Sequence, residues 1–135
     1  MRRVLDPARV TFPRRADDNP FLRYRELLHS YQTAITGGMS DAEFVALVER
    51  LTRAVAEVDG RGFVVTPFAP QDRLGARLAL APGRLWVKDE TGNVSGSHKA
   101  RHLMGVMLYL QVRQETGDRS QEPGRLNAAP TGLES

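Results

Sequence analysis

Apolar residues in the first third of the chain recur at the spacing of one helical face. They stand three or four residues apart, or side by side, at Phe21, Tyr24, Leu27, Leu28 and Tyr31. This spacing predicts a helix over residues 21–35, and the Thr-Gly-Gly run that follows is typical of a helix end. Residues 1–20 are polar and interrupted by proline, so we expect a loop or arm there.

A second helix is predicted with a clear start signal. Ser40 and Glu43 have the spacing of a capping box, in which each side chain bonds the other residue's backbone amide. Behind them, apolar residues repeat mostly every three or four positions at Phe44, Leu47, Val48, Leu51, Val55 and Val58. The pattern predicts an amphipathic helix over residues 40–58, closed by an Asp-Gly pair.

Shorter patterns follow between residues 62 and 112. The run GFVVTPF favours a short β-strand that meets a proline, RLGARLALAPG a short helix, and RLWVKDE a second strand. After the loop TGNVSG, Ser97 is a candidate N-cap for a helix that continues through Val112. Apolar residues cover most of this helix's circumference, so we expect it to be buried on several sides.

The last part of the chain changes character. Residues 114–135 contain three glycines, two prolines and no hydrophobic periodicity, which is typical of an irregular tail. Nothing in this tail would cover the apolar helix before it, so we expect the sequence to stop before its core is complete. The predicted organisation is an N-terminal arm (1–20), a helical segment (21–62), an α/β segment (63–113) and the tail (114–135).

Composition narrows the class of protein. The chain has 135 residues, of which 41% are hydrophobic and none is cysteine. This fits one modest globular domain without disulfides, thiolate metal sites or cysteine nucleophiles. The start of the chain is basic but lacks the apolar run of a signal peptide, and no stretch reaches the roughly 18 to 20 apolar residues of a membrane span. We therefore expect a cytoplasmic protein with no membrane partner and no bound metal.

The net charge of +3 comes mostly from arginine. A nucleic-acid-binding face needs basic residues clustered on one element. The candidates are three arginine pairs at positions 2 and 3, 14 and 15, and 23 and 25, and acidic residues interrupt them. A solvated surface is the favoured interpretation, so we expect no nucleic-acid partner. The weaker alternative is salt-sensitive nucleic-acid binding through these arginines.

Both lysines of the chain, Lys88 and Lys99, lie in the stretch VKDETGNVSGSHKARH, whereas the other 17 of its 19 lysines and arginines are arginine. Lys99 follows a Gly-Ser turn at a predicted helix start. It does not fit a P-loop, because two residues separate it from Gly96. Spacing alone leaves two interpretations open. The commoner one is a solvated surface lysine, and the other is a Schiff-base lysine, whose neutral amine is favoured by partial burial and by the helix dipole.

The stretch as a unit resembles a known motif. From Lys88 it runs KDE, two residues, Asn93, one residue, SGS, one residue, Lys99, one residue, Arg101. This is similar to the lysine segment of threonine synthase and of the wider family of fold-type-II, tryptophan-synthase-β-like enzymes that use pyridoxal phosphate. Upstream, the TPF that begins at Thr66 resembles the TPL that opens this region in many members. The resemblance covers roughly residues 63–112.

The resemblance implies roles for the residues of this motif. Lys99 would form the Schiff base with pyridoxal 5'-phosphate and act as catalytic acid and base. His98 would approach the cofactor phosphate, and Asn93 would lie near the ring hydroxyl. The turn residues implied to meet the amino-acid substrate are Ser95, Gly96 and Ser97. The implied reaction is β- or γ-elimination or replacement on an amino acid, with the cofactor as electron sink.

The fold implied by the resemblance is α/β. It would be a partial three-layer α/β/α domain of the tryptophan synthase β-like type with a helical N-terminal part, and its full-length relatives are often homodimers. A Ser-x-Gly-Asn loop and a Gly-rich phosphate cup, which members carry farther along, do not occur in residues 111–135. We therefore expect this chain alone, as a truncated member, to be weakly active or inactive. The alternative is a non-catalytic remnant or protein-interaction module without cofactor.

Overall fold

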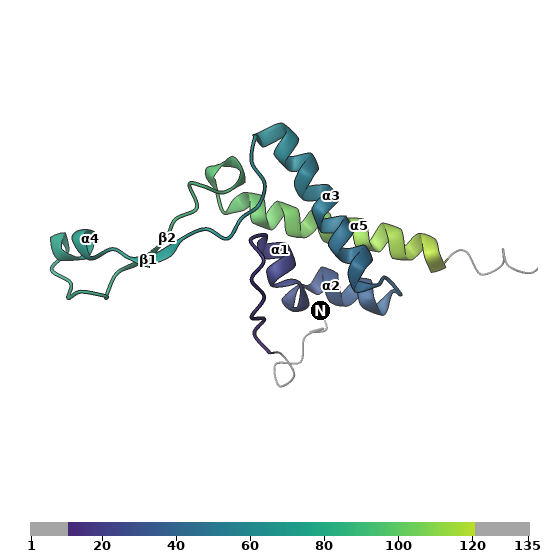
Figure 1. Ribbon diagram of the computed structural model, residues 1–135, viewed down its shortest axis with the longest axis horizontal. Helices are drawn as coiled ribbons and strands as arrows, with labels where there is room; N and C mark the ends of the chain where they lie inside the picture. Colours follow the sequence, from purple (N-terminus) through teal and green to yellow (C-terminus); the bar gives the residue numbers. More distant parts are fainter. Residues whose placement is uncertain (1–10, 121–135) are drawn as a thin grey trace, which may run out of the picture.

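The computed structural model describes the backbone of residues 11–120 and the side chains of residues 11–117. This part of the chain combines helices with a small two-stranded sheet, which confirms the α/β prediction in its coarse form. The elements are α1 (Pro20–Arg23), η1 (Arg25–Leu27), α2 (His29–Thr36), α3 (Asp41–Asp59), β1 (Phe68–Pro70), α4 (Asp72–Arg77), β2 (Trp86–Lys88), η2 (Val94–Gly96) and α5 (Lys99–Ser120). We call α1, η1, α2, α3 and α5 the helical body and residues 67–89 the arm (Figure 1).

The helix predicted over residues 21–35 is wrong in one respect, because it is broken into α1, η1 and α2. Leu28 has an extended backbone (φ −81°, ψ 134°) and separates η1 from α2. The carbonyl of Leu22, which a continuous helix would give to a backbone amide, accepts a hydrogen bond from Arg25 Nη1 (3.0 Å). Of the residues on the predicted face only Phe21 is buried, and periodicity could not detect this competing side-chain donor.

The second predicted helix is confirmed as α3. Its capping box is formed as predicted: the Glu43 amide donates to Ser40 Oγ (3.3 Å), and the Ser40 amide donates to Glu43 Oε2 (2.7 Å). At the other end Gly60 takes the left-handed conformation (φ 80°) that commonly ends helices. The predicted apolar face is buried at Phe44, Leu47 and Val48, whereas Val58 near the end of the helix is 91% exposed.

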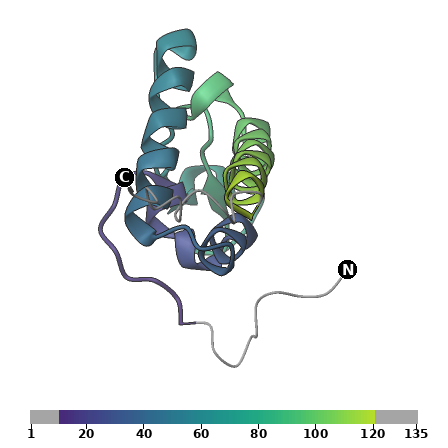
Figure 2. The same cartoon turned by 90° about the vertical axis from the view of Figure 1, so that its right-hand side faces the viewer.

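The core lies where α2, α3 and α5 pack together (Figure 2), and α1 packs against α3. Its buried apolar residues are Phe21, Leu22, Ala34, Met39, Phe44, Leu47, Val48, Phe63, Val94, Met104, Leu108 and Val112. On α5 the buried residues Met104, Leu108 and Val112 are four positions apart and form one face. Leu103 and Leu110 on other faces are 66% and 60% exposed. The expectation that this helix is buried on several sides is therefore wrong for residues 11–120.

Helix α5 is longer than predicted, because it continues to Ser120. The irregular tail was predicted to begin at residue 114, so its first seven positions are instead helical. The buried side chain of Val112 and an ion pair between Arg50 Nη2 and Glu115 Oε1 (2.8 Å) fasten this part of α5 to the body. The remainder of the tail, residues 121–135, and residues 1–10 of the N-terminal arm lie outside the described residues.

The arm extends away from the helical body (Figure 1). The strand predicted in RLWVKDE is confirmed as β2, which pairs antiparallel with β1 in the register Phe68–Lys88 and Pro70–Trp86. The strand predicted in GFVVTPF is displaced, since β1 begins only at Phe68. Between the strands α4 ends at Arg77, earlier than the predicted helix, because Ala79 takes the left-handed conformation (φ 54°).

These two strands do not by themselves make the layers expected from the family resemblance. In residues 11–120 the sheet consists of β1 and β2, which pair with each other. A three-layer α/β/α domain needs a wider sheet with helices on both faces. The described residues therefore establish a helix-rich α/β mixture and leave the finer architecture as a proposal.

Candidate functional site

The loop of residues 89–98, which we call the candidate loop, and Lys99 at the start of α5 include every residue to which the family resemblance assigned a role. The loop begins with a tight turn, in which Asp89 Oδ1 accepts from the amide (2.9 Å) and the hydroxyl (2.6 Å) of Thr91. The Asn93 amide then donates to Glu90 O (3.0 Å), and Val94 enters the core at 6% exposure. The loop is thus fixed at its start by hydrogen bonds and at its middle by burial.

Two consecutive residues of this loop have left-handed backbones. Ser95 has φ 54° and ψ 16°, and Gly96 has φ 60°. This conformation costs about 1 kcal/mol or more for a residue other than glycine, and it persists only where the surroundings enforce it. Here the Ser95 amide donates to Asp59 Oδ1 at the end of α3 (3.1 Å). The turn is therefore strained and tied to the helical body.

Asn93 lies completely buried under this turn. Its Nδ2 donates to Ser97 O (2.8 Å), which fixes the amide orientation because the opposite orientation would place two oxygens together. In the described part of the chain, Asn93 Oδ1 has no hydrogen-bond partner. A buried acceptor left unpaired costs about 1–3 kcal/mol, so this oxygen calls for a donor from a water or a ligand.

Lys99 is the first residue of α5 and is exposed, as is His98 before it. The Lys99 amide donates to Ser97 Oγ (3.2 Å), so Ser97 caps the helix start as predicted. Lys99 is thus exposed in the described structure, which lacks the partial burial that the Schiff-base interpretation invoked. The motif residues 93, 95, 96, 97 and 99 are brought together around one turn, and His98 lies at its exposed edge.

Beside this turn is a polar cluster that the site prediction did not include. Glu90 Oε1 accepts from Thr66 Oγ1 (2.7 Å), and Glu90 Oε2 accepts from Arg101 Nε (3.0 Å). Lys88 Nζ donates to Thr66 O and lies 3.7 Å from Glu90 Oε1. The sequence did contain a signal, because these residues belong to the TPF, KDE and KAR parts of the motif.

The cluster keeps Glu90 ionised. Burial alone would raise the pKa of Glu90, but the hydrogen bonds from Thr66 and Arg101 and the charges of Arg101 and Lys88 outweigh it. The pKa therefore lies below the usual value for a glutamate. Both carboxylate oxygens accept bonds that join separate segments of the chain, which indicates a structural role rather than proton transfer.

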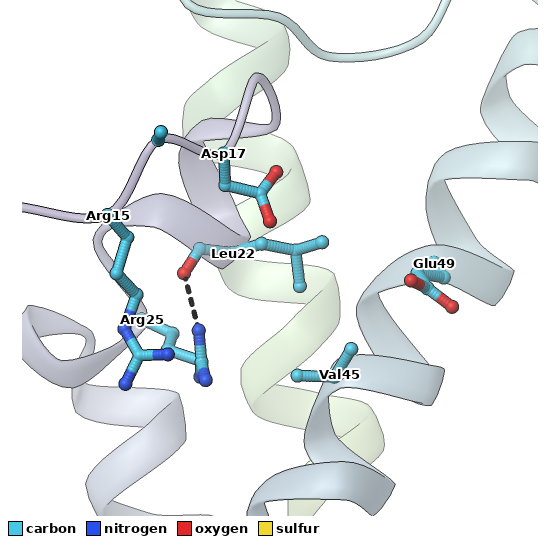
Figure 3. Close-up of a pocket in the computed structure, with 7 residues that line it drawn as sticks. Arg15, Asp17, Leu22, Arg25, Val45 and Glu49 are labelled. Carbon is cyan, nitrogen blue, oxygen red and sulfur yellow. Dashed lines mark hydrogen bonds between the residues drawn. The ribbon is translucent and has the colours of Figure 1, made fainter.

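Two hollows lie on the helical body. The first, of about 530 Å³, is lined by Arg15, Ala16, Asp17, Leu22, Arg25, Val45 and Glu49. Figure 3 shows Val45 and Glu49 projecting from α3 opposite Arg15, Asp17 and Arg25. Arg25 is only 6% exposed, and it donates to both oxygens of Asp41 (2.7 and 2.9 Å).

These bonds from Arg25 lower the pKa of Asp41, despite the opposing effect of burial. A hydrogen bond from the Tyr31 hydroxyl (2.9 Å) acts in the same direction. Arg15 is likewise paired, with Glu26 Oε1 (2.7 Å). The two arginines of this hollow are therefore compensated by carboxylates, which suits a structural role better than anion binding.

The second hollow, of about 400 Å³, lies against the underside of the candidate loop. It is lined by Leu51, Ala54, Val55, Val58, Asp59, Val94 and Met107, and is apolar except for Asp59. Asp59 also holds the Ser95 amide, so this hollow and the strained turn share one residue. Its volume is within the range of small-ligand pockets, about 300–1,000 Å³.

Comparisons of the chain with protein-family models, with curated proteins and with solved structures found no match. Among the helices of residues 11–120, none combines the length and apolar character that a membrane crossing requires. The assignment of a function therefore depends on the geometry of the candidate loop and on the motif that it carries.

Proposed function

We propose that residues 63–112 form the lysine segment of a pyridoxal-phosphate-dependent lyase or synthase of the tryptophan-synthase-β-like family, with Lys99 as the residue that attaches the cofactor. The observation that supports this most is the combination at one turn of an exposed lysine, a strained Ser95–Gly96 backbone and a buried Asn93 oxygen without a partner. Strained backbone and unpaired buried acceptors are uncommon and concentrate at functional sites.

The residues present fit one side of a cofactor site. Lys99 Nζ is accessible for attachment, Asn93 Oδ1 can accept from a hydroxyl group, and His98 can approach a phosphate. When bound, the cofactor would supply an electron sink for β- or γ-elimination or replacement on an amino-acid substrate. Lys99 would hold and move the substrate's α-proton at Nζ, while Ser95, Gly96 and Ser97 would contact the substrate carboxylate.

A Gly-rich phosphate cup is not among the described residues. We therefore propose that residues 11–120 contribute one part of a larger three-layer α/β/α domain, and that this chain by itself has weak activity or none. The apolar side chains exposed on α5 and the arm are consistent with further structure packing there.

Trapping the attached cofactor tests the proposal. The purified chain is incubated with pyridoxal 5'-phosphate, reduced with borohydride, and mapped by mass spectrometry. We expect Lys99 to be labelled in preference to Lys88 and the α-amino group, and the label to be lost in Lys99→Arg. The matched control, Lys88→Arg, removes the chain's other lysine but keeps the positive charge beside Glu90, so the Lys99 label should remain. Equal labelling of all three amines would rule out the proposal.

A second candidate, a non-catalytic interaction module, is favoured by one observation. Leu103, Val106 and Leu110 are exposed on α5 and make an apolar face available to a partner protein. This function predicts a stable fold, no selective label at Lys99, and binding of a partner that Leu103→Glu abolishes. The labelling experiment therefore separates the two candidates directly.

A further inference from the structure

We infer that Arg101 is the positioning residue of the Lys99 site: held by Glu90 and Thr66, it sets where the first turn of α5 lies. This inference rests on the proposed function, because cofactor attachment is what gives the position of Lys99 a chemical consequence. Arg101 does not itself contact the reacting amine in this role. It acts through the backbone of the helical turn that the two residues share.

Arg101 joins α5 to two segments distant in sequence. Its Nε donates to Glu90 Oε2 (3.0 Å), just after β2. Its Nη2 donates to Val64 O (2.8 Å) and Thr66 Oγ1 (3.1 Å), in the segment that precedes β1. The Thr66 hydroxyl donates a hydrogen bond to Glu90 Oε1 (2.7 Å), so the three side chains form a closed triangle.

The triangle is shielded from solvent to a degree unusual for charged groups. The side chains of Arg101 and Glu90 are 22% and 17% exposed, and Thr66 is 4% exposed. Partly desolvated, charge-assisted hydrogen bonds are stronger and more directional than exposed ion pairs. The planar fork of arginine serves acceptors on both segments together, whereas a lysine could not match that geometry.

Lys99 lacks such support of its own. Within residues 11–120, no hydrogen bond or ion pair holds its Nζ atom. Its position therefore follows from the backbone of the first turn, where the Arg101 amide donates to His98 O (3.1 Å). Ser97 caps this turn on one side, and Arg101 fastens it on the other. Loss of the Arg101 bonds would release the second attachment while leaving the cap in place.

The test measures how selectively the cofactor attaches to Lys99 in the full chain. After incubation with pyridoxal 5'-phosphate and borohydride reduction, the label at Lys99 is expressed relative to the label at the chain's α-amino group. We expect this ratio to fall about tenfold in Arg101→Gln, since misplacement of a reacting group by about 1 Å can cost up to 10²-fold. Arg101→Lys should restore part of the ratio. Arg113→Gln, an exposed arginine on the same helix, should leave it unchanged.

A merely structural role is separated by comparing Thr66→Val with Thr66→Ser. The first removes the hydroxyl that closes the triangle and should lower the ratio, while the second keeps it and should rescue the ratio. The two Thr66 variants also test the positioning role if circular dichroism shows that Arg101→Gln does not fold. Cofactor absorbance should fall in parallel with the label.

The outcomes distinguish failure of the proposed function from failure of the positioning role of Arg101. If the unaltered chain shows no preference for Lys99, the proposed function fails and the positioning role falls with it. If the chain prefers Lys99 and folded Arg101→Gln keeps that preference, the positioning role is overturned while the proposed function stands. A loss in Arg101→Gln and Thr66→Val, with rescue by Thr66→Ser, supports both.

Discussion

In the helical body, α2, α3 and α5 bury a continuous set of apolar side chains, whereas in the arm Gly75 is the single buried residue. The arm holds its shape by local contacts instead. Gln71 and Leu85 share a backbone hydrogen bond (2.8 Å), and the rings of Phe68 and Trp86 lie 5.1 Å apart. Buried apolar side chains thus stabilise the body, whereas local hydrogen bonds and ring contacts stabilise the arm.

The difference predicts different stabilities. A two-stranded sheet with no core beneath it is marginal in water, and units with few buried contacts open at low free energy. The body should therefore determine the global free energy of unfolding, while the arm should open locally. The candidate loop lies between the two regions, since it follows β2 and is tied to α3 and α5.

The largest effect should come from truncating one leucine in each region. Leu108 is fully buried in the body, whereas Leu78 in the arm is 59% exposed. We expect Leu108→Ala to lower the free energy of unfolding by about 3 kcal/mol, because it leaves a cavity in the core. Leu78→Ala should change it by less than about 0.5 kcal/mol. Urea denaturation followed by circular dichroism measures both, and equal losses would refute the proposed difference between body and arm.

A smaller effect is expected from arginine pairing. Arg25 in the body is buried against Asp41, while Arg84 in the arm is exposed. Arg25→Met should cost about 2 kcal/mol, because charge-assisted hydrogen bonds are lost, although Asp41 is half exposed and can regain water. Arg84→Met should have no measurable effect. A matched loss in the two variants, measured by thermal unfolding, would show that burial of the arginine is irrelevant.

Glu90, at the junction of arm and body, should make stability depend on pH. Its pKa is lowered in the folded state, so its contribution is present above its ordinary pKa of 4.5 and is lost as the pH falls through the lower folded value. Glu90→Gln should cost about 1 kcal/mol at neutral pH. It should also flatten the decline of stability below pH 4.5. Glu57→Gln, an exposed change on α3, should leave this decline unaltered, and an unchanged slope in Glu90→Gln would contradict the account.

How far the sequence predicts this structure depends on how local the deciding interaction is. The capping box of Ser40 and Glu43 is local and is confirmed, and so is the periodic face of α3 as far as Val55. The break at Leu28 was missed, because Arg25 pairs with Asp41, which lies sixteen residues farther along the chain. The exposure of Leu103 was missed for a related reason: helical periodicity shows that a face is apolar but not whether another element covers it.

The candidate site shows the same limit. Lys99, Ser97 and Asn93 lie within seven positions, so a local motif could group them. Thr66 and Arg101 are 35 residues apart, and the motif contains both without showing that they touch. The role of Lys99 stays a prediction, whereas the helix that begins at this residue and the Ser97 cap are confirmed.

The smallest effect concerns a left-handed backbone conformation that occurs both in the candidate loop and in the arm. Ser95 in the candidate loop and Ala79 in the arm both have φ 54°, a value that favours glycine. Ser95→Gly should raise the global free energy of unfolding by up to about 1 kcal/mol, because the loop is tied to α3 and unfolds with the body. Ala79→Gly relieves the same strain in a region that opens locally. It should therefore slow amide hydrogen exchange within the arm and leave the global value unchanged. If Ala79→Gly raised the global value as much as Ser95→Gly, the arm would unfold together with the body, and its lack of a core would not make it independent.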